Sequence, residues 1–150
     1  MSRLLFLRRV SLFQNLTLDD LLALDGVLRR VDYLEGETIF EEGSVGDDFY
    51  IISEGEVSVR TGGAGGEGSV ERARLQTGDF FGEMALFDDE PRSASCVAAT
   101  ACTLLVLDRG RFYGLIEQMP QLGLAICKTL TQRLRRTERD LRAAHSAKSA

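Results

Sequence analysis

Residues 37–59 read ETIFEEGSVGDDFYIISEGEVSV, in which short runs of β-branched and aromatic residues are separated by breaks that contain glycine. Such residues favour extended backbone, and short runs of them bounded by Gly, Asp and Ser are typical of β-strands. The segments EG, GSVGDD and EGE fit the turns that connect such strands. The stretch therefore predicts successive antiparallel strands joined by short turns.

The same kind of run recurs on both sides of this stretch, as RVDYL (30–34), SVERARL (69–75), SASCVAA (93–99) and CTLLVLD (102–108). About seven or eight short strands at this spacing indicate an antiparallel barrel or jelly roll. A doubly wound α/β fold needs a helix between successive strands, and the connections here leave no room for one.

Helical signals precede and follow the strands. Residues 3–9 form one helical segment, and Thr17 is placed to cap a second, LDDLLALDGVL (18–28). After the strands, Asp108 can cap RGRFYGLIEQ (109–118). Pro120 then fits the start of a long helix, from Leu122 to about Ala144.

The predicted fold class is therefore mainly β, an antiparallel β-roll or jelly roll (a double-stranded β-helix) with N-terminal helices and a long C-terminal helix. We expect a single domain over residues 1–144, followed by a disordered tail over 145–150. Within it we expect N-terminal helices over 1–29, the roll over 30–107 and C-terminal helices over 108–144.

The long predicted helix carries an apolar stripe. Its members recur at alternating intervals of three and four residues: Cys127, Leu130, Leu134, Thr137, Leu141 and Ala144. This spacing is typical of a coiled-coil seam, so the helix predicts a homodimer. The stripe covers only about two and a half heptads, and packing against its own domain is the alternative.

Composition is that of an ordinary globular protein, with 44% hydrophobic and 27% charged residues in a chain of 150. The net charge of -5 argues against non-specific binding of nucleic acid, and the basic cluster over 133–142 is interpreted as a solvated helix face. No apolar run is long enough to span a membrane, and the N-terminus lacks the pattern of a signal peptide.

Cys96, Cys102 and Cys127 are odd in number and lack a CxxC spacing, which indicates reduced thiols and a cytoplasmic location. His145 is the single histidine, so the chain lacks the histidine set that a cupin-like metalloenzyme needs. We expect no catalytic activity, no metal and no cofactor.

The segment TGGAGGEGS (61–69) contains the pattern GxGxxG at Gly63, Gly65 and Gly68. A dinucleotide site needs a helix directly after this pattern, inside a parallel βαβ unit. Here the following segment reads as a strand. The glycines are therefore interpreted as a flexible hairpin.

Residues 80–95, FFGEMALFDDEPRSAS, combine groups that suit a phosphorylated sugar. Gly82 lets the backbone approach a ligand, and the run 84–87 can form a short turn whose N–H groups attract an anion. Ionised Glu83 accepts hydrogen bonds from sugar hydroxyls, while Arg92 offers a planar fork of donors that matches a phosphate.

Ser93 adds a hydroxyl beside this arginine. A structural ion pair between Glu83 and Arg92 is the alternative interpretation. The acidic stretch 88–90 is interpreted as a solvated rim, because its charges would repel a phosphate.

Residues 81–95 closely resemble the phosphate-binding cassette of the cyclic nucleotide-binding domain family, which includes catabolite activator proteins, regulatory subunits of cyclic-nucleotide-dependent kinases and some channels. The cassette runs from Phe-Gly-Glu through a small apolar run and a variable acidic stretch to an arginine followed by small residues. Residues 37–59 resemble the early strands of the family, and TGDFFGE (77–83) resembles the approach to its cassette. The resemblance covers nearly the whole chain.

The resemblance implies a role for each cassette residue. Glu83 would bind the ribose 2′-hydroxyl, and Arg92 would bind the exocyclic oxygens of the cyclic phosphate. The rest of the phosphate cradle would come from Gly82 and from backbone N–H groups around Met84, Ala85 and Ser93.

Base preference depends on residues outside this core. A hydroxyl after the cassette arginine favours guanine in the kinase branch, yet catabolite activator-like domains carry serine there and use cyclic AMP, so Ser93 fits both. Thr137 falls where the activators' threonine meets the adenine amino group, and its alternative is a tolerated polar seam residue. Glu138 departs from the serine that the activators have. Cyclic AMP is the preferred ligand, cyclic GMP the alternative and a cyclic dinucleotide the third choice.

The predicted function is a cyclic nucleotide sensor in which binding repacks the helix at 109–118 and the long helix. One alternative is a degenerate dimerisation module that binds no nucleotide. Another is the regulatory domain of a larger transcription factor, transporter or channel. A recognition helix does not fit before Ala150, so no direct contact with nucleic acid is expected.

Overall fold

The computed structural model describes the backbone of residues 2–149 and the side chains of residues 3–146. Its strands are β1 (Arg29–Tyr33), β2 (Thr38–Phe40), β3 (Asp48–Glu54), β4 (Val57–Thr61), β5 (Val70–Leu75), β6 (Phe80–Phe81), β7 (Ser95–Ala98) and β8 (Cys102–Asp108). Its helices are α1 (Ser2–Arg9), η1 (Ser11–Phe13), α2 (Leu18–Asp25), η2 (Glu83–Leu86), α3 (Arg109–Gln118) and α4 (Pro120–Ser149), of which η1 and η2 are 3-10 turns. The mainly β class with flanking helices is confirmed.

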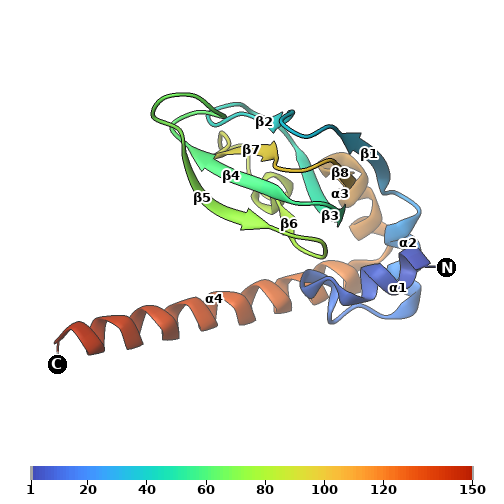
Figure 1. Ribbon diagram of the computed structural model, residues 1–150. Coiled ribbons are helices and arrows are strands. Elements are labelled where there is room, and N and C mark those ends of the chain that lie inside the picture. The colour runs from blue at the N-terminus through green and yellow to red at the C-terminus, as the bar shows by residue number, and fades with distance from the viewer. Residues whose placement is uncertain (1, 150) are drawn as a thin grey trace.

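The strands form two four-stranded sheets, in the orders β1-β8-β3-β6 and β2-β7-β4-β5. Every pairing is antiparallel. The sheets lie face to face in a roll, with the helices gathered against one side of it (Figure 1). The sequence missed only β6, which is two residues long and lies directly before the cassette.

Two apolar clusters fill the domain, and β3 and β8 contribute to both. On β3, Tyr50 and Ile52 point between the sheets, while Phe49 and Ile51 point toward the helices. This follows from the period of two along a strand, which sends alternate side chains to opposite faces. The first cluster, which includes Tyr50 and Ile52, forms the core between the two sheets. The second cluster, which includes Phe49 and Ile51, packs the helices against the roll.

The N-terminal helices close over the second cluster. As predicted, Thr17 caps α2, and the cap is reciprocal: its hydroxyl accepts from the N–H of Asp20 at 3.2 Å, and the Asp20 carboxylate accepts from the N–H of Thr17 at 3.0 Å. Arg3 on α1 then pairs with Asp25 at the end of α2, with 2.5 Å between Nε and Oδ1. These contacts define the start of α2 and join its end to α1.

The C-terminal helices begin where the sequence predicts. Asp108 caps α3 by accepting from the N–H of Arg111 at 2.9 Å, and α4 begins at Pro120. The predicted disordered tail over 145–150 is wrong for residues 145–149, because α4 continues to Ser149. Residues 143–149 hold three alanines and neither Gly nor Pro, so nothing in them breaks a helix. Position 150 lies outside the described residues.

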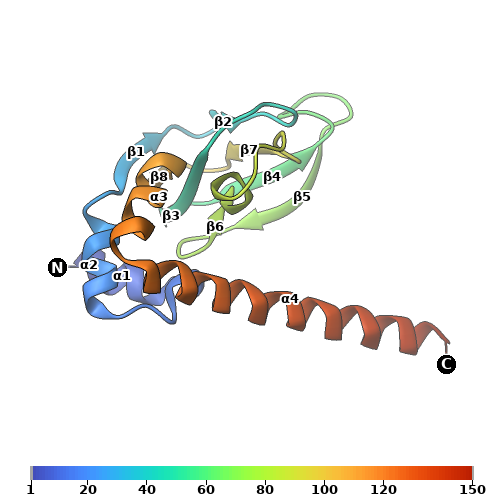
Figure 2. The ribbon, with the colours of Figure 1, turned by 180° about the vertical axis from the view of Figure 1, so that it is seen from behind.

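The first part of α4 packs on the body, and the rest projects away from it (Figures 1 and 2). Leu122 and Ile126 are buried and Leu130 is half-buried, whereas every described side chain from 131 to 146 is exposed. Leu134 and Leu141 are 61% and 66% exposed. From Leu134 onward, the apolar stripe therefore does not pack on its own domain.

The glycine-rich segment forms the connection between β4 and β5, which pair antiparallel from Val57–Leu75 to Thr61–Val70. A strand follows it, not a helix, so the hairpin interpretation is confirmed. Across the described residues, no helix has the combination of length and apolar content that crossing a membrane requires.

Candidate functional site

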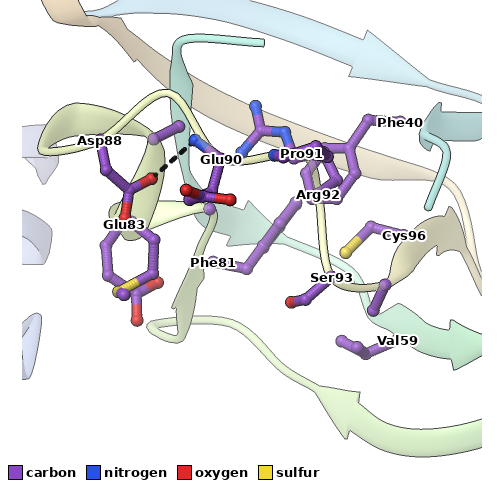
Figure 3. A pocket seen from close by; sticks show the side chains of 14 residues that line it. Phe40, Val59, Phe81, Glu83, Asp88, Glu90, Pro91, Arg92, Ser93 and Cys96 are labelled. Carbon is purple, nitrogen blue, oxygen red and sulfur yellow. Dashed lines mark hydrogen bonds between the residues drawn. The ribbon is translucent and has the colours of Figure 1, made fainter. Parts of the chain in front are cut away.

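The roll opens into a pocket of about 350 Å³ beside η2. This volume is at the lower end for sites that bind small organic ligands. Figure 3 shows the cassette residues on its walls, with strand residues behind them. The lining residues are Phe40, Val59, Phe81, Gly82, Glu83, Met84, Ala85, Asp88, Glu90, Pro91, Arg92, Ser93, Ala94 and Cys96. The structure thus brings together Gly82, Glu83, Met84, Ala85, Arg92 and Ser93, all six of the predicted cassette residues.

Arg92 is anchored by its backbone to the loop between β2 and β3. Its N–H donates to the carbonyl of Ser44 at 2.7 Å, and its carbonyl accepts from the N–H of Gly43 at 2.8 Å. The residue is 9% exposed, and its Nη2 donates to the carbonyl of Asp48 at 2.9 Å. The guanidinium carbon lies 4.1 Å from the ring centroid of Phe40, within the range of a cation–π contact. The loop between β2 and β3, the first residue of β3 and an aromatic ring therefore hold the arginine in the pocket wall.

The Arg92 side chain also carries an unused donor. Among the buried side-chain nitrogen and oxygen atoms of the described residues, Nε of Arg92 is the only one without a hydrogen-bond partner. A buried donor without a partner costs about 1–3 kcal/mol. An anionic oxygen that enters the pocket and reaches Nε would recover this cost.

Two glycines leave room for the guanidinium. A Cβ on Gly46 would lie 3.1 Å from Nη2 of Arg92, and a Cβ on Gly82 would lie 2.9 Å from Nη1. Gly82 also has a φ of +77°, in the left-handed region that other residues rarely adopt. The turn into η2 therefore requires glycine at position 82 for two reasons. The backbone there has a positive φ, and a Cβ would crowd the guanidinium of Arg92.

Glu83 begins η2, on the opposite side of the pocket from Arg92 (Figure 3). Among the described residues, the ion pairs do not include one between these two side chains, so the structure does not support the structural ion pair. The Glu83 carboxylate is half-buried. Both charged groups remain available to a molecule between them.

The backbone of η2 is partly engaged. The N–H of Ala85 donates to the carbonyl of Gly82 at 3.1 Å, so this predicted cradle donor already has a partner. The side chain of Met84 is 65% exposed at the edge of the pocket, and Ser93 is exposed on the other side.

The acidic stretch after η2 lies at the mouth of the pocket. Glu90 is exposed, and its N–H donates to the Asp88 carboxylate at 3.2 Å, the dashed line in Figure 3. Asp89 forms an ion pair with Arg109 at the start of α3. The sequence did not predict this connection to the helix.

Thr137 does not reach the pocket in this structure. It lies on the exposed part of α4, and its hydroxyl donates to the carbonyl of Arg133 at 3.1 Å. The predicted contact between Thr137 and the base therefore requires α4 to approach the roll, or a second chain.

The pocket coincides with the region that known proteins share with this chain. The cyclic nucleotide-binding domain family matches residues 30–119, which is more than half of the sequence. The chain belongs to the cyclic nucleotide-binding domain family.

Relatives of this domain include bacterial regulators and eukaryotic kinases. A CRP-like cAMP-activated global transcriptional regulator of Mycobacterium tuberculosis is 32% identical over 135 residues, which are 90% of this chain and 60% of the regulator. The cGMP-dependent protein kinase egl-4 of Caenorhabditis briggsae is 39% identical over 118 residues, 78% of this chain and 16% of the kinase. The chain thus spans under two thirds of either relative.

A solved structure shares the whole arrangement. The N-terminal domain of a transcriptional regulator from Streptomyces coelicolor superposes with a TM-score of 0.80 at 30% identity, covering 91% of this chain and 94% of that domain. The β-roll and its helices therefore have an arrangement that is already known from a solved regulator domain.

The sequence reasoning missed part of the pocket of this cyclic nucleotide-binding domain. Phe40, Val59 and Cys96 line it from three neighbouring strands, where Cys96 pairs with both Phe40 and Val59. The alternation within each run places these side chains on the inner face, but only the pairing register shows that they meet. Burial raises the pKa of the Cys96 thiol to about 12, so this pocket residue stays protonated and unreactive at neutral pH.

The described residues of the domain include no group of three or more His, Cys, Asp or Glu side chains that could hold a metal ion. The charges at the pocket are one guanidinium and several carboxylates. The arrangement is suited to hold a ligand that has one anionic group and several hydroxyls.

Substitution of Gly82 tests the space around Arg92. We expect Gly82→Ala to lower the free energy of unfolding by about 1–2 kcal/mol, because alanine is strained at positive φ. We also expect weaker binding of cyclic AMP, because the Cβ displaces the guanidinium. Urea denaturation and calorimetry would measure the two effects.

Gly78 is the matched control, since its φ is +94° and a Cβ there would meet nothing within 4 Å. Gly78→Ala should lower the free energy of unfolding by a similar amount and should bind cyclic AMP with the affinity of the wild type. Equal affinities in the two variants would refute the role of Gly82 in making room for Arg92.

Proposed function

We propose that this domain binds a 3′,5′-cyclic nucleotide in the pocket beside η2, with cyclic AMP preferred over cyclic GMP. The observation that carries the proposal is the Arg92 guanidinium, which is buried in the pocket wall with an unpartnered Nε. A buried cation with an unused donor is suited to an anion of matching geometry, such as a phosphate.

We assign each residue a role from its position in the pocket. Arg92 binds the exocyclic phosphate oxygens, and Glu83 accepts from the ribose 2′-hydroxyl across the pocket. Gly82 and the N–H groups of Met84, Ala85 and Ser93 complete the phosphate cradle. Because the Ala85 N–H is bonded to Gly82 in this structure, its contribution requires the turn to loosen when the phosphate enters.

The preference for cyclic AMP is supported by the mycobacterial relative, which is a cAMP-activated regulator. It is also supported by the resemblance that places Thr137 where the activators' threonine meets the adenine amino group. The cGMP-dependent kinase supports the alternative. The hydroxyl of Ser93 fits both nucleotides.

Signal output depends on the helices in this proposal. The ring of Phe87, directly after η2, contacts Phe112 on α3 edge to face at 5.8 Å. An inward movement of the cassette therefore displaces α3, and α4 follows because only Met119 separates the two helices. Binding then shifts the domain between two arrangements of its C-terminal helices.

A second copy of the chain is the proposed partner of α4. The exposed leucines of the stripe leave apolar surface in contact with solvent, which a second helix would bury. Their spacing matches a parallel coiled coil. In that arrangement Arg133 faces Glu138 of the second copy from the positions that flank the seam, and these opposite charges set the register. The homodimer also provides a second chain from which Thr137 or its neighbours can reach the base.

We further propose that the domain acts in the cytoplasm as a non-catalytic regulatory module. Its three cysteines are free thiols, and two of them are buried, which is typical of proteins in reducing compartments. We do not expect the domain to contact nucleic acid directly, because the basic residues of α4 are interpreted as a solvated helix face.

Titration with cyclic AMP and cyclic GMP by isothermal calorimetry tests the function. For a ligand of roughly twenty heavy atoms at about 0.3–0.4 kcal/mol each, we expect about 6–8 kcal/mol of binding free energy. This corresponds to a Kd that is micromolar or a little weaker. A flat titration with both nucleotides would refute the proposal and favour a dimerisation module that binds no nucleotide.

A further inference from the structure

Arg109, the first residue of α3, connects the helix to the cassette through three groups. Its Nε donates to the carbonyl of Ala85 at 2.8 Å, and its Nη2 donates to the carbonyl of Asp88 at 2.6 Å. Its Nη1 forms the ion pair with Asp89. One guanidinium thus binds η2 and the acidic stretch that follows it.

No other described side chain does this. Throughout the described part of the chain, all other hydrogen bonds of residues 83–91 stay between Gly82 and Glu90. The other contacts with α3 are apolar and not directional: Phe87 meets Phe112 edge to face, and buried Leu86 lies in the same cluster as Phe112 and Leu115. Arg109 therefore supplies the directional contacts between this pocket wall and α3.

We propose that Arg109 is a positioning residue for ligand binding, which fixes the wall from Glu83 to Glu90 at the separation from Arg92 that the ligand requires. This inference rests on the proposed function, because the ligand is the cyclic nucleotide of the same pocket. Arg109 does not line the pocket and acts through the backbone of η2.

The two kinds of contact contribute unequally. The side chain of Asp89 is 86% exposed and that of Arg109 is 23% exposed, so solvent screens the ion pair. The carbonyls of Ala85 and Asp88 are part-buried acceptors, and the planar fork of arginine matches them in direction. Lysine keeps the charge but supplies no fork. The directed hydrogen bonds to the two carbonyls, more than the charge of Arg109, therefore hold the pocket wall in place.

The experiment compares four variants of the full chain by calorimetry with cyclic AMP, at low and high salt. We expect Arg109→Gln to bind about tenfold more weakly and Arg109→Lys about fivefold more weakly, at both salt concentrations. Asp89→Asn should change affinity less than about twofold. Arg111→Gln is the matched control, because Arg111 lies on the same helix and, among the described residues, forms its ion pair with Asp108 and not with the cassette. This variant should leave affinity unchanged.

Hydrogen exchange of the ligand-free proteins supplies a second measurement. Arg109→Gln should raise exchange over residues 83–91 and leave β3 and β8 unchanged, whereas general destabilisation would raise exchange in those strands too. Full affinity in Arg109→Gln, or full rescue by Arg109→Lys, would overturn the proposal. If the wild type does not bind, the proposed function fails, and unchanged exchange over 83–91 would overturn the link to α3 separately.

Discussion

Replacement of Arg92 by alanine is expected to weaken binding of cyclic AMP by between about tenfold and a thousandfold. Hydrogen bonds to charged partners contribute roughly 1.5–3 kcal/mol each, and the guanidinium can offer the phosphate more than one. The variant also removes the buried unpartnered Nε, which offsets part of the stability lost with the hydrogen bond to the Asp48 carbonyl and the contact with Phe40. Calorimetry measures the affinity, and urea denaturation confirms that the variant is folded.

Arg72→Ala is the matched control for this change. Arg72 lies on the exposed strand β5, where its Nε donates to the hydroxyl of Thr61, and it does not line the pocket. Arg92→Lys adds a second comparison, since a lysine keeps the charge but not the planar fork. Wild-type affinity in Arg92→Ala would exclude Arg92 as the phosphate-binding group.

The second large effect is expected at the α4 stripe, where Leu134→Gln combined with Leu141→Gln should convert a dimer into a monomer of 16.6 kDa. Burial of a leucine stabilises by about 1.5–3 kcal/mol, and a dimer would bury four of these side chains. The dimer dissociation constant should therefore rise at least about a thousandfold. Glutamine retains good helix propensity, so α4 itself remains formed.

Sedimentation equilibrium over a range of protein concentrations measures this change. The pair Arg135→Gln and Arg142→Gln is the control, because these residues have the same spacing of seven but lie beside the seam and not in it. A wild-type protein that is monomeric throughout, or a leucine variant that remains dimeric, would reject α4 as the dimer interface.

Local signals were enough to predict most of this fold. Thr17 and Asp108 are caps whose side chains bond a backbone N–H three residues on, so each helix start depends on a few adjacent residues. β6 was missed because two residues give no periodic pattern. The predicted end of α4 is wrong because a short polar tail resembles a disordered one in composition, although its alanines permit a helix.

The site was predictable to the extent that its residues are adjacent in sequence. The cassette is one segment, and all its predicted members line the pocket. Phe40 and Arg109 could not be identified in this way. The first is placed by its register with Cys96, and the second by the packing of α3 on η2, and both depend on pairings between distant segments.

The double role of β3 and β8 limits how this protein can change. Because Tyr50 and Ile52 face the space between the sheets while Phe49 and Ile51 face the helices, a polar substitution at any of these four β3 residues would enter one of the two cores. Sequence variation within the roll is easier to accommodate on β5 and on the glycine-rich hairpin connection before it, since five of the six residues of β5 are exposed. That hairpin is the place where an inserted reporter or a new binding loop would disturb the two cores least.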